Sequence, residues 1–388
     1  MDFRINKNQE MLRQMARDFA VKEITPYAAK WDKEESCPME TIAKLHDMGL
    51  MSIAIPEEYG GPGLDNVSLC LIMEELSKAD AGLATIVMGS ALLGSDPVLI
   101  AGTKEQKKWW YDRMLDGAIA AFCLTEPEAG TDAGNMSTRC EKDGDSYVIN
   151  GIKQFISNGQ FAKQFSLMAT LDKKMGPKGM CAFMIDRDTP GISISKKEEK
   201  LGIRSSATNE IVFDNVRVPV KNLLGSEGQG MHIIMQTLDI SRTGVAAMAT
   251  GICQASLEAA VKYAGERVQF GKPIGSFQAI QFMLADMAMY TETSRLLYLK
   301  AASLQDAKLP FKMLSSMAKS WAGDAAVKVS CDAIQVFGGY GYTKDYPVEK
   351  YYRDAKIMQI YEGTAQVQRM VIGKDLTKTG YTPFYVEP

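Results

Sequence analysis

The feature that most constrains this chain's fold is a stretch of short strand-like segments, residues 119–218, with helical sequence on either side. Each segment is a short apolar run, and turn-forming pairs such as Asn158-Gly159 and Asp214-Asn215 separate the runs. Short strands without intervening helices predict a small antiparallel sandwich or barrel. The candidate strands contain residues 122–124, 147–149, 165–168, 181–185, 192–194 and 210–213.

Helical periodicity is found on both sides of this stretch. Upstream, Met11, Met15 and Phe19 recur at helical spacing, and Thr103 with Gln106 has the pattern of a capping box. Downstream, alanine- and methionine-rich segments predict a helical bundle, with helices over about residues 230–268, 276–306 and 310–337. The chain of 388 residues is therefore predicted to be α+β, mainly α, with domains over 1–118, 119–226 and 227–388.

Composition excludes several classes of protein. The net charge of −3 provides no basic surface for nucleic acid. No apolar run reaches the ~20 residues that a membrane span requires, and the N-terminus lacks the plan of a signal peptide. We therefore expect a cytoplasmic protein with no nucleic-acid partner and no membrane span.

The cysteine and histidine contents argue against metal chemistry. The seven cysteines are scattered and odd in number, with no CxxC spacing, which predicts reduced thiols and neither disulfides nor zinc. His46 and His232 are the only histidines, which removes most histidine-based catalysis and most transition-metal sites. A carboxylate base with an organic cofactor, and no metal, is the better expectation.

A candidate base lies near the C-terminus, in Tyr361-Glu362-Gly363-Thr364. Glu362 stands between an apolar run and a glycine, where partial desolvation would raise its pKa and make the ionised form a stronger base. Gly363 would let a ligand approach the backbone closely, and Thr364 would cap the following helix. The alternative is a plain helix start whose glutamate faces water.

Four further segments combine polar groups with turns. Arginine and glycine backbone suit diphosphate and ribose contacts. In residues 153–159, an aromatic and a hydroxyl stand two residues apart, on one face of a strand. No Walker motif occurs, and the glycine-rich residues 225–230 are predicted to be a turn into a helix. The four segments, each explicable alone as a turn or a cap, are residues 122–132, 153–159, 267–273 with Gln278, and 335–341.

Together and in this order, the five segments resemble the acyl-CoA dehydrogenase family, flavoproteins that oxidise acyl-CoA thioesters. The resemblance covers nearly the whole chain and is closest to the short-chain, butyryl-type branch. It implies that family's fold, with an N-terminal helical domain, a middle β-barrel or sandwich and a C-terminal four-helix bundle. It also implies FAD as cofactor, an electron-transfer flavoprotein as electron acceptor, and a homotetramer that holds FAD partly between subunits.

The resemblance assigns cofactor contacts residue by residue. Thr125 would bond the pyrimidine side of the flavin, Phe155 would lie against the ring, and Ser157 would sit near N5. Many relatives have tryptophan and threonine at the last two positions; the aromatic face and the hydroxyl are kept here, although the redox tuning could differ. The set implied for FAD is Phe122, Leu124, Thr125, Thr131, Phe155, Ser157, Arg267, Phe270, Gln278, Gln335, Gly338, Gly339, Thr364 and Gln366.

The same resemblance makes Glu362 the catalytic base. Some branches carry the base where this chain has Ser241, which cannot serve. Glu362 would remove the α-proton of the thioester while the β-hydrogen leaves as hydride to flavin N5. A ribityl hydroxyl and the backbone N–H of the base would hold the thioester oxygen. Substrate contacts are implied for Thr131, Asp239, Arg242, Tyr361 and Gly363.

The acyl group is inferred from residues 84–97, which match the family's pocket-lining helix. The segment has no cation and is rich in small residues, and glutaryl-type relatives carry an arginine where this chain has Ala84. A neutral short, branched or alicyclic acyl-CoA is therefore expected. Asp96 is either an N-cap ahead of Pro97 or a second polar group in the pocket. Enoyl-CoA reduction by the same site, an acyl-CoA oxidase, and a non-catalytic scaffold that binds CoA or flavin are the alternatives.

Overall fold

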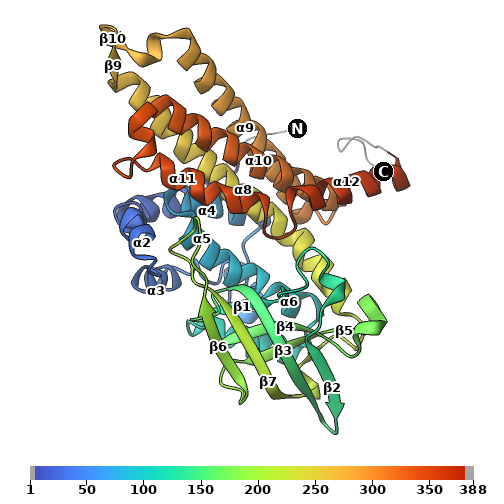
Figure 1. The fold of residues 1–388 in the computed structure, drawn as a ribbon. Coiled ribbons are helices and arrows are strands. Elements are labelled where there is room, and N and C mark those ends of the chain that lie inside the picture. The colour runs from blue at the N-terminus through green and yellow to red at the C-terminus, as the bar shows by residue number, and fades with distance from the viewer. Residues whose placement is uncertain (1–4, 381–388) are drawn as a thin grey trace. The chain divides into compact units, whose positions relative to one another are not determined.

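The computed structural model describes residues 5–380, and its secondary structure follows the sequence pattern (Figure 1). Helices come first, strands follow from Ala120 to Leu224, and helices return from Gly230, which confirms the predicted α+β class. The α-helices are α1 (Lys7–Phe19), α2 (Ala28–Glu34), α3 (Met39–Asp47), α4 (Asn66–Ala79), α5 (Ala81–Met88), α6 (Asp96–Ala101), α7 (Lys104–Leu115), α8 (Gly230–Glu266), α9 (Gln278–Asp306), α10 (Lys312–Phe337), α11 (Val348–Ala355) and α12 (Ala365–Thr379). The strands are β1 (Ala120–Cys123), β2 (Arg139–Asp143), β3 (Ser146–Ser157), β4 (Gln164–Thr170), β5 (Met180–Asp186), β6 (Ile192–Lys197), β7 (Thr208–Pro219), β8 (Leu223–Leu224), β9 (Val268–Gln269) and β10 (Lys272–Pro273).

The chain forms two compact units, each built from segments that are not contiguous in sequence. The sheet unit comprises Gln14–Asp65 and Ala79–Ser241. Within the described residues, the bundle unit comprises 5–13, 66–78 and 242–380.

The sheet unit contains an eight-stranded sheet in the order β6-β7-β3-β2-β4-β5-β8, with β1 paired in parallel to β4. Most neighbouring strands are antiparallel, as predicted, and all six candidate strands are present. Two strands of this sheet were not predicted from the sequence: β2, which is largely polar and exposed, and β8, which has two residues. One apolar core of the unit contains Phe165, Phe183 and Phe213, and a second joins Trp110 of α7 to Met168 and Met180.

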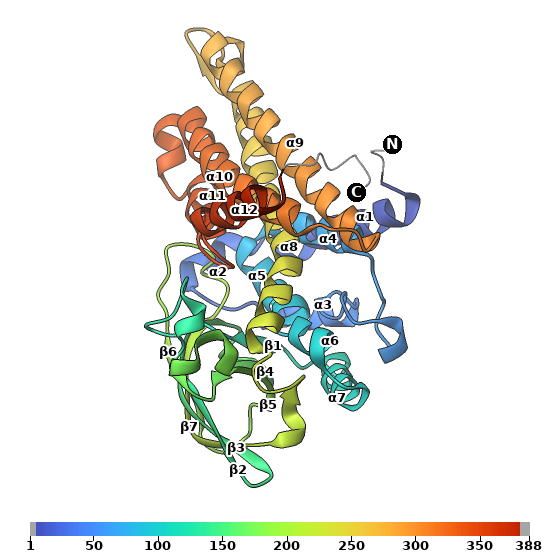
Figure 2. The same ribbon diagram turned by 90° about the vertical axis from the view of Figure 1, so that its right-hand side faces the viewer.

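In the bundle unit, α10 packs against α9, α11 and α12 (Figure 2). The predicted long helices are confirmed within a few residues as α8, α9 and α10. Alanines make this close packing possible, and Ala318, Ala322 and Ala326 of α10 are fully buried. Because a methyl group occupies little space, neighbouring helices can approach α10 closely and position the segments that follow it.

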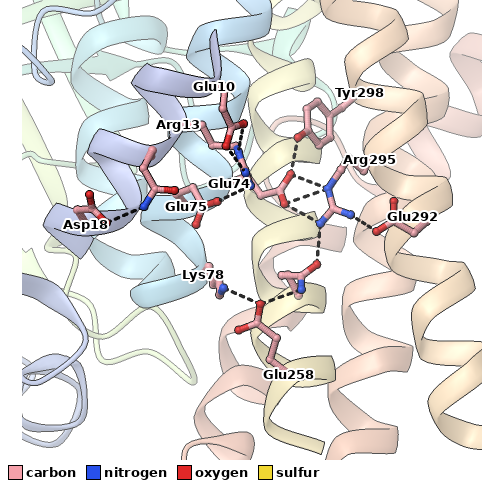
Figure 3. Close-up of polar contacts among 12 residues, drawn as sticks. Glu10, Arg13, Asp18, Glu74, Glu75, Lys78, Glu258, Glu292, Arg295 and Tyr298 are labelled. Carbon is pink, nitrogen blue, oxygen red and sulfur yellow. Dashed lines mark hydrogen bonds and ion pairs between the residues drawn. The ribbon is translucent and has the colours of Figure 1, made fainter. Parts of the chain in front are cut away.

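A partly buried polar network joins α1 and α4 to α9 (Figure 3). Arg295 pairs with Glu74 at 2.7 Å, and Tyr298 donates a hydrogen bond to the same carboxylate. On the other side of α4, Glu75 pairs with Arg13 at 3.2 Å. Buried charges are stable only when they are paired, so these contacts specify where α4 packs on the C-terminal helices. They explain why residues 66–78 belong to the bundle unit despite their distance in sequence.

Two helical segments do reach the length and apolarity of a membrane span, contrary to the expectation from the sequence. They are Ala81–Ala101 and Gly230–Glu266, and 83% and 72% of their most apolar windows are buried inside the protein. Core helices of soluble proteins have the same composition, so the two segments are weak evidence for a membrane.

Candidate functional site

In the sheet unit, a buried ion pair holds the loop after β1 against β3. Lys153 Nζ lies 2.7 Å from Glu126 Oε1, and the two side chains are 0% and 3% exposed. Lys153 also donates to the Leu124 carbonyl at 3.0 Å, and the Gln154 N–H donates to the Thr125 carbonyl at 2.8 Å. Two strand residues therefore fix the loop segment that is predicted to contact the flavin.

The electrostatics of this pair favour the ionised carboxylate. Burial alone would raise the pKa of Glu126, but the Lys153 ammonium and the N–H groups of Ser137 and Thr138 outweigh it and hold that pKa below its ordinary value. Burial lowers the pKa of Lys153, against the opposing effect of Glu126. Both members of the pair are hydrogen-bonded to further groups of the protein, as buried ions require.

The predicted aromatic–hydroxyl pair lies where β3 becomes irregular. The register with β7 shifts between Lys153 and Ile156, and Phe155 has a φ of 58°. The regular alternation on which the one-face expectation rested is therefore interrupted by a bulge. Phe155 is 58% exposed, so its ring is available to a planar ligand, while Ser157 is partly buried.

The segment expected to line the acyl pocket lies against the end of β3. α5 continues into a π-helical turn, Gly89–Leu93, a feature that is frequent at functional sites. A Cβ added at Gly89 would be 3.1 Å from Asn158 Nδ2 and 3.7 Å from Ser157 Cβ. The Asn158 amide donates to the Ile86 and Ala120 carbonyls, which ties this helix to β1 and β3. A side chain at position 89 would therefore occupy space beside Ser157 that the glycine leaves open.

Asp96 is the first residue of α6, and the N-cap position belongs to Ser95 rather than to Asp96. Asp96 is 2% exposed and lies near Tyr111. Burial chiefly, with a further contribution from Asp96, raises the pKa of Tyr111 well above its ordinary value. Asp96 is thus a buried acid in the first turn of a helix, where the helix dipole favours a negative charge.

In the bundle unit, Glu362 lies in a tight turn between α11 and α12. Glu362 and Gly363 have φ values of 55° and 91°, so two successive residues are left-handed. A left-handed glutamate is unusual and costs free energy, which contacts with its surroundings must offset. The Thr364 hydroxyl accepts from the Val367 N–H at 3.2 Å, which confirms the predicted cap of α12. The Glu362 side chain is partly buried, as expected for a base that is partly dry.

Three buried side chains bond the two carbonyls of this turn, which is called the base turn below (residues 362–363). Arg242 Nε and Gln368 Nε2 each donate to the Glu362 carbonyl at 3.3 Å. Lys319 Nζ donates to the Gly363 carbonyl at 2.7 Å, and Gln368 Nε2 donates to it at 3.0 Å. A Cβ at Gly363 would lie 2.7 Å from Gln368 Nε2, so glycine is required there for packing as well as for its positive φ.

A second part of the bundle unit forms a cavity of about 690 Å³ around the β9–β10 turn and the end of α10. Arg267, Phe270, Gly338 and Gly339, all predicted cofactor contacts, line it together. The Arg267 guanidinium lies 5.4 Å from the centre of the Tyr340 ring, and Phe270 is 94% exposed. A guanidinium, a side-chain-free backbone and exposed rings suit a diphosphate with an attached aromatic base, so this lining fits the ADP part of FAD.

The remaining predicted contacts are placed as follows. Phe122 and Leu124 are partly buried against the second core of the sheet unit, and Thr131 is exposed in the loop beyond them. Asp239 is partly buried and stands three residues before the buried Arg242 on α8, while Ser241 is buried. Tyr361 donates to the Met358 sulfur at 3.0 Å. Gln278, Gln335 and Gln366 are exposed, and the first two are not among the residues that line the cavity.

Four residues that hold these segments received no role from the sequence: Glu126, Lys153, Lys319 and Gln368. Lys153 occupies an inward position in a strand where Tyr147 and Ile149 are also buried. Lys319 falls on the same helical face as the buried Ala322 and Ala326. A lysine in an apolar stripe was the signal that could have identified both of them. Within residues 5–380, no group of three or more histidine, cysteine, aspartate or glutamate side chains is placed to hold a metal ion.

Known proteins resemble this chain over nearly its whole length. Family models described as the N-terminal, middle and C-terminal domains of acyl-CoA dehydrogenase match residues 6–118, 121–216 and 228–377. The short-chain-specific acyl-CoA dehydrogenase of Clostridium acetobutylicum is 46% identical over 96% of this chain and 98% of its own length.

Solved structures extend the comparison to the fold. Butyryl-CoA dehydrogenase from Megasphaera elsdenii superposes with a TM-score of 0.95 at 43% identity, covering 97% of this chain and 100% of its own. An acyl-CoA dehydrogenase from Bacillus anthracis, solved in complex with FAD, gives 0.90 at 31% identity, covering 96% of this chain and 68% of its own. The protein therefore belongs to the acyl-CoA dehydrogenase family and is an FAD-dependent oxidoreductase of the short-chain, butyryl-type branch.

Proposed function

We propose that the protein dehydrogenates a neutral short, branched or alicyclic acyl-CoA to the 2-enoyl-CoA, with Glu362 as the base. The observation that supports this most directly is the base turn, in which a partly buried carboxylate is presented from a left-handed backbone held by Arg242, Gln368 and Lys319. Strained backbone that several buried groups maintain is typical of catalytic positions.

The proton step is carried by residues of this chain. The Glu362 carboxylate takes the α-proton of the thioester, and its partial burial limits competition from water. The backbone N–H of Glu362 supports the thioester oxygen as negative charge develops on it. Because both base-turn carbonyls already accept hydrogen bonds, the turn does not have to rearrange when the charge appears.

FAD, when bound, supplies the acceptor for the hydride that leaves the β-carbon. We assign its ADP part to Arg267, Phe270, Gly338 and Gly339, which line one cavity, with Gln278, Gln335, Thr364 and Gln366 as further contacts. We assign the ring to Phe155 and Ser157 and to the loop residues Phe122, Leu124, Thr125 and Thr131. The exposed ring at the β3 bulge and the fixed Thr125 carbonyl support that assignment.

The test is anaerobic mixing of the purified protein with a panel of acyl-CoAs while the flavin absorbance is followed. Bleaching by short neutral acyl-CoAs supports the proposal, and no bleaching by any thioester contradicts it. Admission of air, or of an electron-transfer flavoprotein, then identifies the electron acceptor. We propose the electron-transfer flavoprotein, so reoxidation by air alone at a comparable rate would favour an oxidase.

We predict that butyryl-CoA or a compact cyclic acyl-CoA bleaches the flavin far faster than glutaryl-CoA at equal concentration. Ala84 and Ala91 are buried and small, Gly89 leaves space beside Ser157, and residues 84–95 contain no cation. A buried carboxylate without a partner costs about 3 kcal/mol or more, which corresponds to ~100-fold in relative rate. Glutaryl-CoA as the best substrate would overturn this interpretation of residues 84–95.

We predict that tight FAD binding requires self-association, with a homotetramer as the proposed state. Phe282, Met289 and Leu296 follow one another at seven-residue spacing on α9 and are 62%, 59% and 50% exposed. An apolar stripe of this kind on a helix marks an interface. Sedimentation of the holoprotein over a dilution series should show FAD release together with dissociation. A monomer that retains one FAD per chain would contradict the prediction.

A further inference from the structure

Lys319 lies beneath the base turn and is almost completely buried. It is 1% exposed on α10, and its ammonium group donates to the Gly363 carbonyl at 2.7 Å. Nearby on α10, Gly323 lets the chain before the base turn approach the helix closely. A Cβ at Gly323 would lie 2.7 Å from the Met358 carbonyl oxygen. Asp324 accepts from Gln359 at 2.7 Å and from Arg369 at 2.6 Å. Residues 319–324 of α10 therefore contact and position residues 358–369.

The Gly363 carbonyl does not require an ammonium group in order to be satisfied. Gln368 already donates to that carbonyl at 3.0 Å, and Gln368 is itself fully buried. Placing a charged amine in the interior costs free energy that a neutral donor would not cost. A negative charge nearby offsets such a cost, and the Glu362 carboxylate supplies it.

The charged groups that face Lys319 come from three parts of the bundle unit. Burial lowers its pKa to about 8, the Glu362 carboxylate opposes that effect, and the buried Arg242 of α8 reinforces it. Asp324, on α10 itself, also favours the charged form, and Asp324 is in turn paired with Arg369 of α12. Below pH 8 the ammonium is therefore charged, and its strongest carboxylate neighbour is Glu362.

We propose that Lys319 is a positioning residue for Glu362: it fixes the left-handed base turn and places a buried positive charge beside the carboxylate. The inference rests on the proposed role of Glu362 as the base. The hydrogen bond sets where the carboxylate stands, and the charge favours its ionised form at a pH where it must accept a proton.

The test compares Lys319→Met, Lys319→Gln and Lys319→Arg with the parent holoprotein, and uses Lys328→Met as the control. Lys328 lies on the same helix, is half exposed and pairs only with Asp332 among the contacts described. Met removes donor and charge, Gln keeps a donor, and Arg keeps the charge. For Met, flavin reduction at saturating butyryl-CoA should fall by about 10- to 100-fold, because misplaced catalytic groups cost factors of this size.

The pH dependence separates positioning from simple packing. Lys319 is charged on the acid side of pH 8, so its removal takes a favourable cation away from Glu362. On the acid side of the pH profile, the pH at which the flavin-reduction rate is half-maximal should therefore rise in the Met and Gln variants. This midpoint should stay closest to that of the parent in the Arg variant. The carboxyl band of Glu362 in infrared difference spectra, assigned with Glu362→Gln, should shift its titration in the same direction without any turnover.

The outcomes distinguish failure of the inference from failure of the proposed function. If Glu362→Gln reduces flavin normally, the assignment of the base is wrong. If Glu362→Gln is inactive while Lys319→Met and Lys319→Gln keep the parent rate and the parent midpoint, Lys319 only fills space and the inference is overturned. Should the Met variant not fold, the Gln variant decides alone: a raised midpoint supports the inference and an unchanged midpoint overturns it.

Discussion

Replacement of Glu362 by glutamine should abolish nearly all flavin reduction while the folded, FAD-loaded protein survives. The amide has the shape of the carboxylate but cannot accept the α-proton, and loss of a general base costs about 10²- to 10⁴-fold or more. The backbone contacts of the turn involve the carbonyls of residues 362 and 363, which the substitution leaves in place. Anaerobic stopped-flow reduction by butyryl-CoA measures the effect directly.

The control for this variant is Glu40→Gln, which removes an exposed carboxylate on α3. It should retain the parent rate. Binding of a non-reactive CoA thioether to the Glu362→Gln protein should stay within a few-fold of the parent, because the change affects the transition state rather than ground-state binding. A near-normal reduction rate for Glu362→Gln would rule out its role, and the buried Asp96 would become the next carboxylate to test.

Much of the fold follows from periodicity and caps. The six candidate strands, the long helices α8, α9 and α10, and the Thr103 and Thr364 caps are all confirmed by the structure. These features depend on local pattern, in which side-chain spacing and nearby hydrogen bonds decide the backbone. Glu362 was also singled out from its local sequence, because it stands between an apolar run and Gly363 and just before the helix cap Thr364; its left-handed backbone was not predicted.

The features of the fold and site that could not be predicted from the sequence depend on contacts between residues far apart in the chain. Lys153 reaches Glu126 across 27 positions, and Lys319 reaches Gly363 across 44. The bulge at Phe155 arises from its pairing with β7, and periodicity along β3 alone does not show it. Polar side chains in apolar stripes are the only local sign of such contacts, and their partners cannot be read from spacing.

Replacement of Lys153 by methionine should lower the free energy of unfolding of the protein and weaken its binding of FAD. In the parent, the Glu126 side chain is 3% exposed and lies 2.7 Å from the Lys153 ammonium. In the variant, its buried carboxylate would lose that positive partner. Removing one partner of a buried ion pair costs about 3–5 kcal/mol of unfolding free energy. The Leu124 carbonyl would also lose its bond, so the loop that contains Thr125 would loosen. Urea unfolding and the FAD dissociation constant measure the two effects, with the exposed Lys142→Met on β2 as the control.

The double variant Lys153→Met with Glu126→Gln should regain part of the lost stability, because no uncompensated charge remains buried. Acid then provides a second check on the pair. The pKa of Glu126 is held below its ordinary value of 4.5, so its stabilising contribution is present above pH 4.5 and is lost as pH falls through the lower folded value. The difference in unfolding free energy between the parent and the double variant should therefore shrink as the pH falls below 4.5. A difference that is constant with pH would mean that the pair does not stabilise the loop through charge.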